Sequence, residues 1–292
     1  MPAAPTQPID ARPARRPRDD EIESYGITHT GKVRDTNQDH FLIASLRQRL
    51  VVRQSSLPDV EQLPVSDDRV ASIMMVADGV GGGKKGEDAS KLALQQLSRY
   101  ISASIRSYYR AETGDGDFVH ALEEAALKCH DAVVAQGESD MSAAGMATTL
   151  TLFMVVWPWT YVLQVGDSRY YQYRQGTLTQ ISRDQTMAQE LLDSGVFAAA
   201  VASNSPLANV LSSSIGGPQT TPVVKRLPTS WSTVHLLCSD GLTKHVPDSR
   251  IAERLGAMTS AKQACEALLQ DALDGGGTDN ITVLIARAVA KD

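Results

Sequence analysis

Four apolar runs in this sequence, each of a length typical of a buried β-strand, are bordered within two residues by an aspartate. They are Ser72–Ala77 with Asp78, Thr160–Val165 with Asp167, Val234–Cys238 with Asp240, and Ile281–Ala286 with Asp279. A carboxylate at the mouth of a buried strand loses hydration, which is costly unless a cation or a hydrogen-bond donor compensates. Each pair alone is also typical of a turn. Together, on runs that can share one core, they predict an oxygen-ligand site for Mg²⁺ or Mn²⁺.

Composition narrows the class of protein. The chain has 292 residues, 42% of them hydrophobic, which is enough apolar material for a sizeable core. Its formal net charge of −6 argues against a general nucleic-acid binder. The three cysteines (Cys129, Cys238 and Cys265) lie far apart without a CxxC spacing. That usage is typical of a reducing compartment, so we expect a cytoplasmic protein.

Two segments were tested for targeting or membrane signals. Residues 1–22 are rich in Pro, Ala and Arg and lack an apolar signal core, so we expect a disordered tail before a domain at residues 23–290. Met141–Gly166 contains no charged residue. Trp157-Pro158-Trp159 interrupts it, however, and Pro breaks a helix. The segment therefore predicts two strands joined by a tight turn rather than a membrane span.

Hydrophobic periodicity predicts an α+β fold of antiparallel sheets with helices on their outer faces, because several strands follow one another without an intervening helix. The predicted strands are Ser24–His29, His40–Ser45, Arg69–Ala77, Ala147–Val156, Thr160–Val165, Tyr170–Arg174, Val234–Cys238 and Ile281–Ala288. The predicted helices are Gly86–Arg110, Phe118–Gln136, Met187–Ser194, Asp248–Gly256 and Ala261–Leu273. Val52–Asp68 and Gly195–Pro218 are irregular, and the second is a candidate mobile flap.

Other chemistries fit the sequence less well. The glycines after Asp78 do not form a Walker A loop, and although Gly81–Gly86 satisfies GxGxxG, the acidic strand that a dinucleotide site needs does not follow. Neither a Cys-x5-Arg loop nor GxSxG is present, and the histidines form no HExxH pair. Arg34 precedes a predicted strand, and a guanidinium beside a dication cluster is a natural fork for phosphate oxygens. These features together favour a phosphate ester as substrate.

With these residues assembled, the chain resembles the metal-dependent protein phosphatases of the PP2C (PPM) type, and their bacterial branch in particular. The resemblance spans about Tyr25 to Ala288 and consists of six blocks in the family's order. They are VRDTNQD (33–39), VADGVGGGKKGEDAS (76–90), GMATT (145–149), VGDSRYYQYRQGTLTQISRDQT (165–186), LCSDGL (237–242) and GGGTDNITVLIAR (275–287).

The resemblance implies a fold and a set of roles. The fold is the αββα sandwich, in which two face-to-face antiparallel sheets are flanked by helices. Two Mn²⁺ or Mg²⁺ ions are implied, with Asp78 bridging both, the carbonyl of Gly79 on the second ion, and Asp240 and Asp279 on the first. Asp39 would act through water, Arg34 would bind the substrate phosphate, and Asp167 would help to hold a third ion. Residues 195–218 resemble the flap beside the cleft.

Several residues depart from the family pattern. Gln38 stands where Glu is frequent, Val80 where animal members carry a histidine, and Gly83 and Gln185 where bacterial members often have one. The general acid therefore stays unassigned; water or a mobile histidine could fill the role.

The sequence thus predicts a phosphatase that hydrolyses phosphoserine or phosphothreonine in proteins, by a water activated between two cations. Its expected partners are phosphorylated proteins, among them a Ser/Thr kinase and its substrates, with no nucleic acid and no membrane. Two alternatives stay open: a pseudophosphatase that binds phosphoproteins without turnover, motivated by Gln38 and the missing histidines, and hydrolysis of a small phosphate ester.

Overall fold

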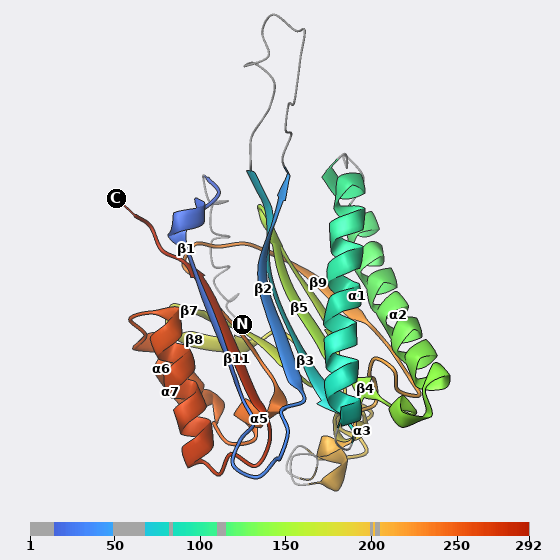
Figure 1. The fold of residues 1–292 in the computed structure, drawn as a ribbon. Coiled ribbons are helices and arrows are strands. Elements are labelled where there is room, and N and C mark those ends of the chain that lie inside the picture. The colour runs from blue at the N-terminus through green and yellow to red at the C-terminus, as the bar shows by residue number, and fades with distance from the viewer. Residues whose placement is uncertain are drawn as a thin grey trace, which may run out of the picture.

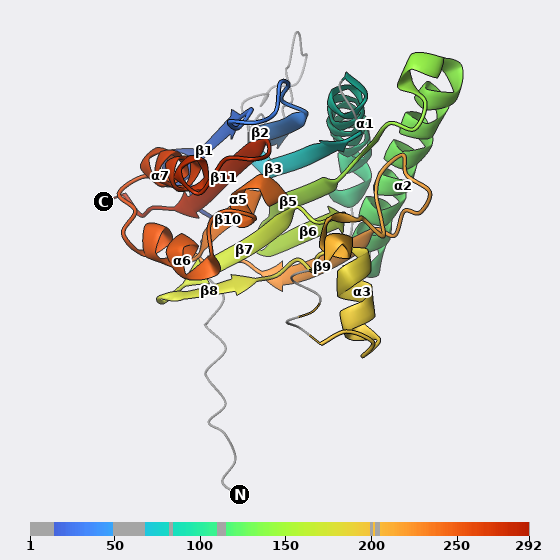
Figure 2. The same cartoon turned by 90° about the horizontal axis from the view of Figure 1, so that it is seen from below.

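The fold was analysed in a computed structural model, which describes residues 15–48, 68–81, 84–109, 115–198, 201 and 205–291. Two β-sheets face each other, and helices pack on the outer face of each (Figures 1 and 2). This arrangement confirms the predicted α+β class and the αββα sandwich. No helix among the described residues is of a length and apolarity suited to crossing a membrane.

Both sheets are antiparallel in every described strand pair. The first contains, in spatial order, β1 (Ile22–His29), β11 (Ile281–Ala288), β10 (Val234–Cys238), β7 (Arg169–Arg174) and β8 (Thr177–Gln180). The second contains β2 (Asp39–Gln48), β3 (Asp68–Val80), β5 (Leu150–Val156), β6 (Trp159–Val165) and β9 (Val223–Pro228), with β4 (Ala147–Thr148) paired to β3. Strands β2 and β3, β5 and β6, and β7 and β8 are antiparallel neighbours within a sheet, whereas the chain crosses between the sheets from β1 to β2, from β6 to β7 and from β9 to β10.

Helices cover the two outer faces. In Figure 2 the pair α1 (Lys84–Tyr109) and α2 (Asp115–Ser139) lies beyond the second sheet, and α6 (Asp248–Gly256) and α7 (Ala261–Asp274) lie beyond the first. The shorter helices are α3 (Met187–Asp193), α5 (Asp240–Thr243) and the 3₁₀ turns η1 (Asp19–Glu21), η3 (Met141–Ala143) and η4 (Pro206–Asn209).

Three apolar layers hold the sandwich together, one between the sheets and one under each helical face. Strand β3 shows why its sequence is a continuous apolar run. Ile73 and Met75 pack toward α1 and α2, whereas Met74 and Val76 pack toward the other sheet. Side chains alternate between the two faces of a strand, and both faces of β3 are covered.

Every predicted strand and helix is present, with shifts of a few residues at the ends. One prediction needs correction: Ala147–Val156 is not one strand but two, because Thr149 leaves the ladder between β4 and β5 to bond Asp78. Strands β8 and β9 and helix α5 were not predicted from the sequence. Of these, β8 and β9 are short sheet-edge strands with mostly partly exposed residues, and α5 is a single turn.

The described residues cover only part of the predicted tail and of the irregular segment Val52–Asp68. Residues 1–14 of the tail and residues 49–67, which include most of the 52–68 segment, lie outside them. Within residues 15–21, Arg15 binds the buried carboxylate of Glu21, and Asp19 pairs with Arg69. The boundary between tail and domain at residue 23 stays a prediction.

The predicted flap is described at residues 195–198, 201 and 205–218. Its second half is anchored to the domain, because Ile215 is fully buried and forms a β-bridge with Thr148. Mobility of this segment stays a prediction.

A histidine is buried between the sheets, at the end of the sandwich opposite Asp78. His235, the second residue of β10, is 6% exposed and shares a 2.8 Å hydrogen bond through Nδ1 with the hydroxyl of Tyr170. Its ring centroid lies 4.5 Å from that of Phe153. Burial lowers the pKa of His235 to about 3, so the ring is neutral in the folded protein at ordinary pH.

The depressed pKa of His235 predicts a loss of stability in acid. The unfolded chain gains a proton on this ring below about pH 6.5, and the folded protein does not until about pH 3, so stability is lost as the pH falls through this window. We expect His235 to contribute about 2 kcal/mol of destabilisation at pH 5 relative to pH 7.5. Urea unfolding across this range should show a flatter pH profile for His235→Gln than for the wild type. His120→Gln, at a 79% exposed side chain, is the control and should leave the profile unchanged. A pH profile in His235→Gln equal to that of the wild type would contradict the role of His235 in the loss of stability in acid.

Candidate functional site

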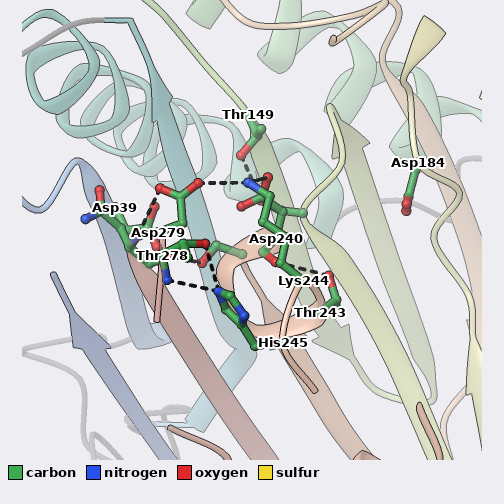
Figure 3. Close-up of polar contacts among 12 residues, drawn as sticks. Asp39, Thr149, Asp184, Asp240, Thr243, Lys244, His245, Thr278 and Asp279 are labelled. Carbon is green, nitrogen blue, oxygen red and sulfur yellow. Dashed lines mark hydrogen bonds and ion pairs between the residues drawn. The ribbon is translucent and has the colours of Figure 1, made fainter. Parts of the chain in front are cut away.

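The predicted site residues meet at one end of the sandwich, where strands from both sheets terminate. Asp39 begins β2 and lies directly opposite Asp78 of β3 in the strand register. From the other sheet, Asp240 opens α5 immediately after β10, and Asp279 lies just before β11 (Figure 3). Three of the four aspartates that border the apolar runs, Asp78, Asp240 and Asp279, thus lie at this end of the sandwich together with Asp39, which only the family resemblance had implied.

Asp39 is the most deeply buried of these carboxylates, at 3% exposure. Its Oδ2 accepts hydrogen bonds from the hydroxyls of Ser239 and Thr282, both at 2.7 Å. Its Oδ1 is buried and has no hydrogen-bond partner among the described residues. Burial raises the pKa of Asp39 to about 6, against the effect of the two hydroxyls and with a further contribution from Asp240.

Asp78 is held in place through its backbone amide and carbonyl. The hydroxyl of Thr149 accepts from the Asp78 amide at 2.9 Å, and the hydroxyl of Thr148 donates to the Asp78 carbonyl at 2.8 Å. Burial raises the pKa of Asp78 well above its ordinary value, and the nearby charges of Asp39 and Asp240 raise it further. The next residue must be glycine, because a Cβ on Gly79 would lie 2.2 Å from the carbonyl oxygen of Gly86.

Asp279 is surrounded by cations. Arg34 reaches both of its oxygens, with Nε 2.8 Å from Oδ1 and Nη2 3.0 Å from Oδ2. Lys244 approaches Oδ2 to 2.8 Å and also lies 2.6 Å from Oδ2 of Asp240. Burial alone would raise the pKa of Asp279, but the hydrogen bonds from Lys244 and Arg34 outweigh it and lower the pKa. Lys244 was not predicted as a site residue. Its spacing of four residues from Asp240 indicates only an ordinary ion pair within a helix.

Asp240 has one satisfied oxygen and one that is not. Oδ2 binds Lys244, whereas Oδ1 is buried and has no partner among the described residues. Burial raises the pKa of Asp240, and Lys244 counteracts part of that rise.

Asp167 lies in the turn between β6 and β7, on the same side of the site as Asp240. It is 9% exposed, and burial raises its pKa to about 8, with further contributions from Asp240 and Asp184. Arg169 neutralises Asp184 through several hydrogen bonds of 2.6 to 3.1 Å. A mostly polar cavity of about 490 Å³ opens here, next to α3 and η4. Its lining includes Asp167, Asp184, Gln189, Asn209, Asp240 and Lys244.

Asn280 ties the Arg34 loop to the site and was not singled out from the sequence. Its Nδ2 donates to the carbonyls of Thr30 and Thr36, and its Oδ1 accepts from the amide of Gln38. Gln38 in turn donates to the carbonyl of Gly81, so it has a structural partner in the place where the family often has Glu.

Gln185 also has a structural role. Its Oε1 accepts from the amide of Gly166 at 2.7 Å and its Nε2 donates to the carbonyl of Thr221, which fixes the turn that carries Asp167. Of the histidines near the site, His245 binds Thr278 rather than any of the clustered carboxylates (Figure 3).

The donor set fits a hard divalent cation. All of the clustered side chains offer oxygen, and two buried carboxylate oxygens, Oδ1 of Asp39 and Oδ1 of Asp240, have no partner among the described residues. Within the same residues, no three His, Cys, Asp or Glu side chains stand in a geometry that would hold one ion. Lys244 and Arg34 engage two of these carboxylates, Asp240 and Asp279. Ligation by Asp78, Asp240 and Asp279 therefore stays a prediction.

The two hydroxyls on Asp39 give a test of how its charge is held. We expect Thr282→Val to lower the free energy of unfolding at neutral pH by about 2 kcal/mol, because a buried carboxylate loses a donor. Thr28→Val is the control: the Thr28 hydroxyl shares a 2.8 Å hydrogen bond with Thr282 and accepts another from Nδ2 of Asn37, so this change removes two neutral contacts and leaves both hydroxyls on Asp39 in place. Urea unfolding should show a smaller loss for Thr28→Val, and equal losses would contradict the role of Thr282.

Comparison with known proteins was made on both sequence and structure. The model of the protein phosphatase 2C family matches residues 59–275. The chain is 33% identical over 222 residues to the serine/threonine protein phosphatase PstP of Mycobacterium tuberculosis, covering 76% of this chain and 41% of that relative. It therefore spans less than half the length of PstP. It is 32% identical over 216 residues to the serine/threonine phosphatase stp of Listeria welshimeri, covering 73% of this chain and 83% of the relative.

A solved structure shows the same architecture. The catalytic domain of PstP in complex with two manganese ions matches with a TM-score of 0.70 and 28% identity, covering 92% of this chain and 99% of that one.

Proposed function

The chain belongs to the protein phosphatase 2C family, and from that premise we propose that it hydrolyses phosphoserine and phosphothreonine in proteins with two divalent cations. The observation that carries this proposal is the convergence of buried carboxylates from both sheets, two of which keep an oxygen without a partner among the described residues. Buried carboxylates without compensation are costly, so such oxygens favour a cation.

The role proposed for each group is the one that the family resemblance implies. Asp78 and the carbonyl of Gly79 would hold the ions from β3, and Asp240 and Asp279 would hold the first ion from the other sheet. Asp39, bound on one side by Ser239 and Thr282, would act through water with its free oxygen. Asp167, which lies beside the cavity, would contribute to a third ion. When bound, Mn²⁺ or Mg²⁺ supplies the positive charge that makes water acidic enough to react near neutral pH.

Arg34 would position the substrate. Its side chain is 52% exposed and its guanidinium already holds a carboxylate in a two-pronged contact, the same geometry that binds two phosphate oxygens. In the transition state this group would stabilise charge on the equatorial oxygens while water attacks in line. None of the cysteines is suited to nucleophilic attack: all three are buried, and burial raises each thiol pKa to about 12.

The expected substrates are phosphorylated proteins, including a Ser/Thr kinase and the proteins that it modifies. The cavity beside the site supports a peptide-sized ligand, because at about 490 Å³ it extends well beyond the carboxylate cluster to α3 and η4. A substrate chain would lie along this polar surface, with the phosphate at Arg34.

A pseudophosphatase is the alternative, and turnover separates the two. Mn²⁺ titration coupled to release of phosphate from a phosphothreonine peptide should show metal-dependent hydrolysis. Mn²⁺ binding without phosphate release would favour the pseudophosphatase, and activity that survives thorough chelation would contradict the metal mechanism.

Asp240→Asn tests the first-ion ligand. We expect kcat on a phosphothreonine peptide with Mn²⁺ to fall by at least about a hundredfold, because the change removes the charge of one predicted ligand. The control is Asp274→Asn, an exposed aspartate at the end of α7, which should retain wild-type activity. Wild-type activity in Asp240→Asn would exclude the role proposed for Asp240.

Arg34 is tested with two substitutions that separate charge from shape. Arg34→Ala should raise KM for the phosphopeptide roughly tenfold, and Arg34→Lys should have an intermediate effect because it keeps the charge and loses the fork. Steady-state kinetics at saturating Mn²⁺ give the comparison. Identical KM values for all three proteins would mean that Arg34 does not bind the phosphate.

A further inference from the structure

Lys244 lies directly between two of the predicted metal ligands. It follows α5, one helical turn after Asp240, and its side chain is 30% exposed. Its ammonium group lies 2.6 Å from Oδ2 of Asp240 and 2.8 Å from Oδ2 of Asp279 (Figure 3). The ammonium therefore bridges Asp240, which follows β10, and Asp279, which precedes β11. These two strands are neighbours in the first sheet.

The remaining oxygens of this pair show what else could be bound there. Oδ1 of Asp279 accepts from Arg34 and from the amide of Asn280, and Oδ2 accepts from Lys244 and also from Nη2 of Arg34. Asp240 offers Oδ2, also bound to Lys244, and the partnerless Oδ1. An ion bound by Asp240 and Asp279 together could use the partnerless Oδ1 of Asp240, but on Asp279 it would need an oxygen that Lys244 or Arg34 already holds.

Electrostatic repulsion opposes the presence of the Lys244 ammonium and a divalent ion at Asp240 and Asp279 at the same time. A divalent ion and an ammonium within about 4 Å of each other repel by several kcal/mol even in a polar protein environment. Lys244 therefore has to leave at least one of its partners when an ion binds there. Room for it exists, because Lys244 also lines the 490 Å³ polar cavity, into which its flexible side chain can turn.

We propose that Lys244 is an internal competitor for the divalent cation: its ammonium holds Asp240 and Asp279 and sets how tightly the first ion binds. This inference rests on the metal site of the proposed function. It assigns to Lys244 the control of metal affinity, separate from binding of the phosphate.

Calorimetric titration with Mn²⁺ tests the inference. The proteins to compare are the wild type, Lys244→Met and Lys225→Met, at one pH and ionic strength after chelation and dialysis. Lys225 is the matched control, because it carries the same charge on β9 but bonds only the carbonyl of Ile181 among the contacts found for it. We expect Lys244→Met to bind Mn²⁺ about tenfold more tightly, and Lys225→Met to resemble the wild type.

The outcomes separate the two proposals. Unchanged or weaker Mn²⁺ binding in Lys244→Met, with normal binding in the wild type, would overturn the role of Lys244 alone. Absence of Mn²⁺ binding in the wild type would instead overturn the metal site of the proposed function. Equal tightening in Lys225→Met would reduce the effect to net charge and would also overturn the inference.

Thermal unfolding gives a second readout that does not depend on activity. A ligand that binds only the folded state raises Tm by an amount that grows with the logarithm of its affinity, so at equal Mn²⁺ concentration the rise should be larger in Lys244→Met than in the wild type. Without Mn²⁺ the variant should melt lower, because both carboxylates lose a partner. Lys244→Gln serves the same comparison if the methionine variant does not fold. An equal Mn²⁺-induced rise in variant and wild type would contradict competition.

Discussion

The arrangement of this protein depends on the burial of several carboxylates at one end of a β-sandwich. Taking an ionised carboxylate out of water costs several kcal/mol, and neighbouring like charges add to that cost. The protein compensates only in part. Ser239 and Thr282 satisfy one oxygen of Asp39, and Arg34 and Lys244 neutralise Asp279, while Asp39 and Asp240 each keep an oxygen without a partner in the described part of the chain.

The rest of the fold stabilises this unfavourable cluster. Three apolar layers fix the strands, and the strand register places Asp39 opposite Asp78. Close backbone contacts fix the two carboxylates of the first sheet relative to each other. A Cβ on Gly241 would lie 1.9 Å from the carbonyl oxygen of Asn280, so a side chain there would push apart the segments that carry Asp240 and Asp279. The stability gained from packing of the core thus offsets the cost of preorganising a charged site, as is typical of functional sites.

The cationic side chains of Arg34 and Lys244 would compete with metal ions from solution for the same carboxylate oxygens. Arg34 and Lys244 lower the electrostatic cost of Asp279, yet both contacts involve groups that the family resemblance assigns to phosphate or to metal. Arg34 is thereby held beside the position where a substrate phosphate would bind, and Lys244 beside the position of the first ion. The same ion pairs that stabilise the cluster are therefore the ones that substrate and metal would rearrange.

Much of the architecture was predictable because it depends on local patterns. Alternating or continuous apolar runs located the strands that form most of both sheets, and Trp157-Pro158-Trp159 marked a hairpin rather than a membrane span. Strands β8 and β9 escaped, because short edge strands that are partly exposed carry little apolar signal. The break at Thr149 was not predicted either, since it arises from hydrogen bonds to Asp78, which lies on a strand far away in the sequence.

The sequence by itself determined which aspartates stand at strand ends, because apolar periodicity and turn residues are properties of neighbouring positions. Only the tertiary structure decided what each carboxylate meets. Lys244 lies four residues from Asp240 but 35 from Asp279, and its bridge between them exists only because β10 and β11 are adjacent. Hydrogen bonds, burial and the resulting pKa shifts depend on distances in space, and those are set by the packing of the two sheets.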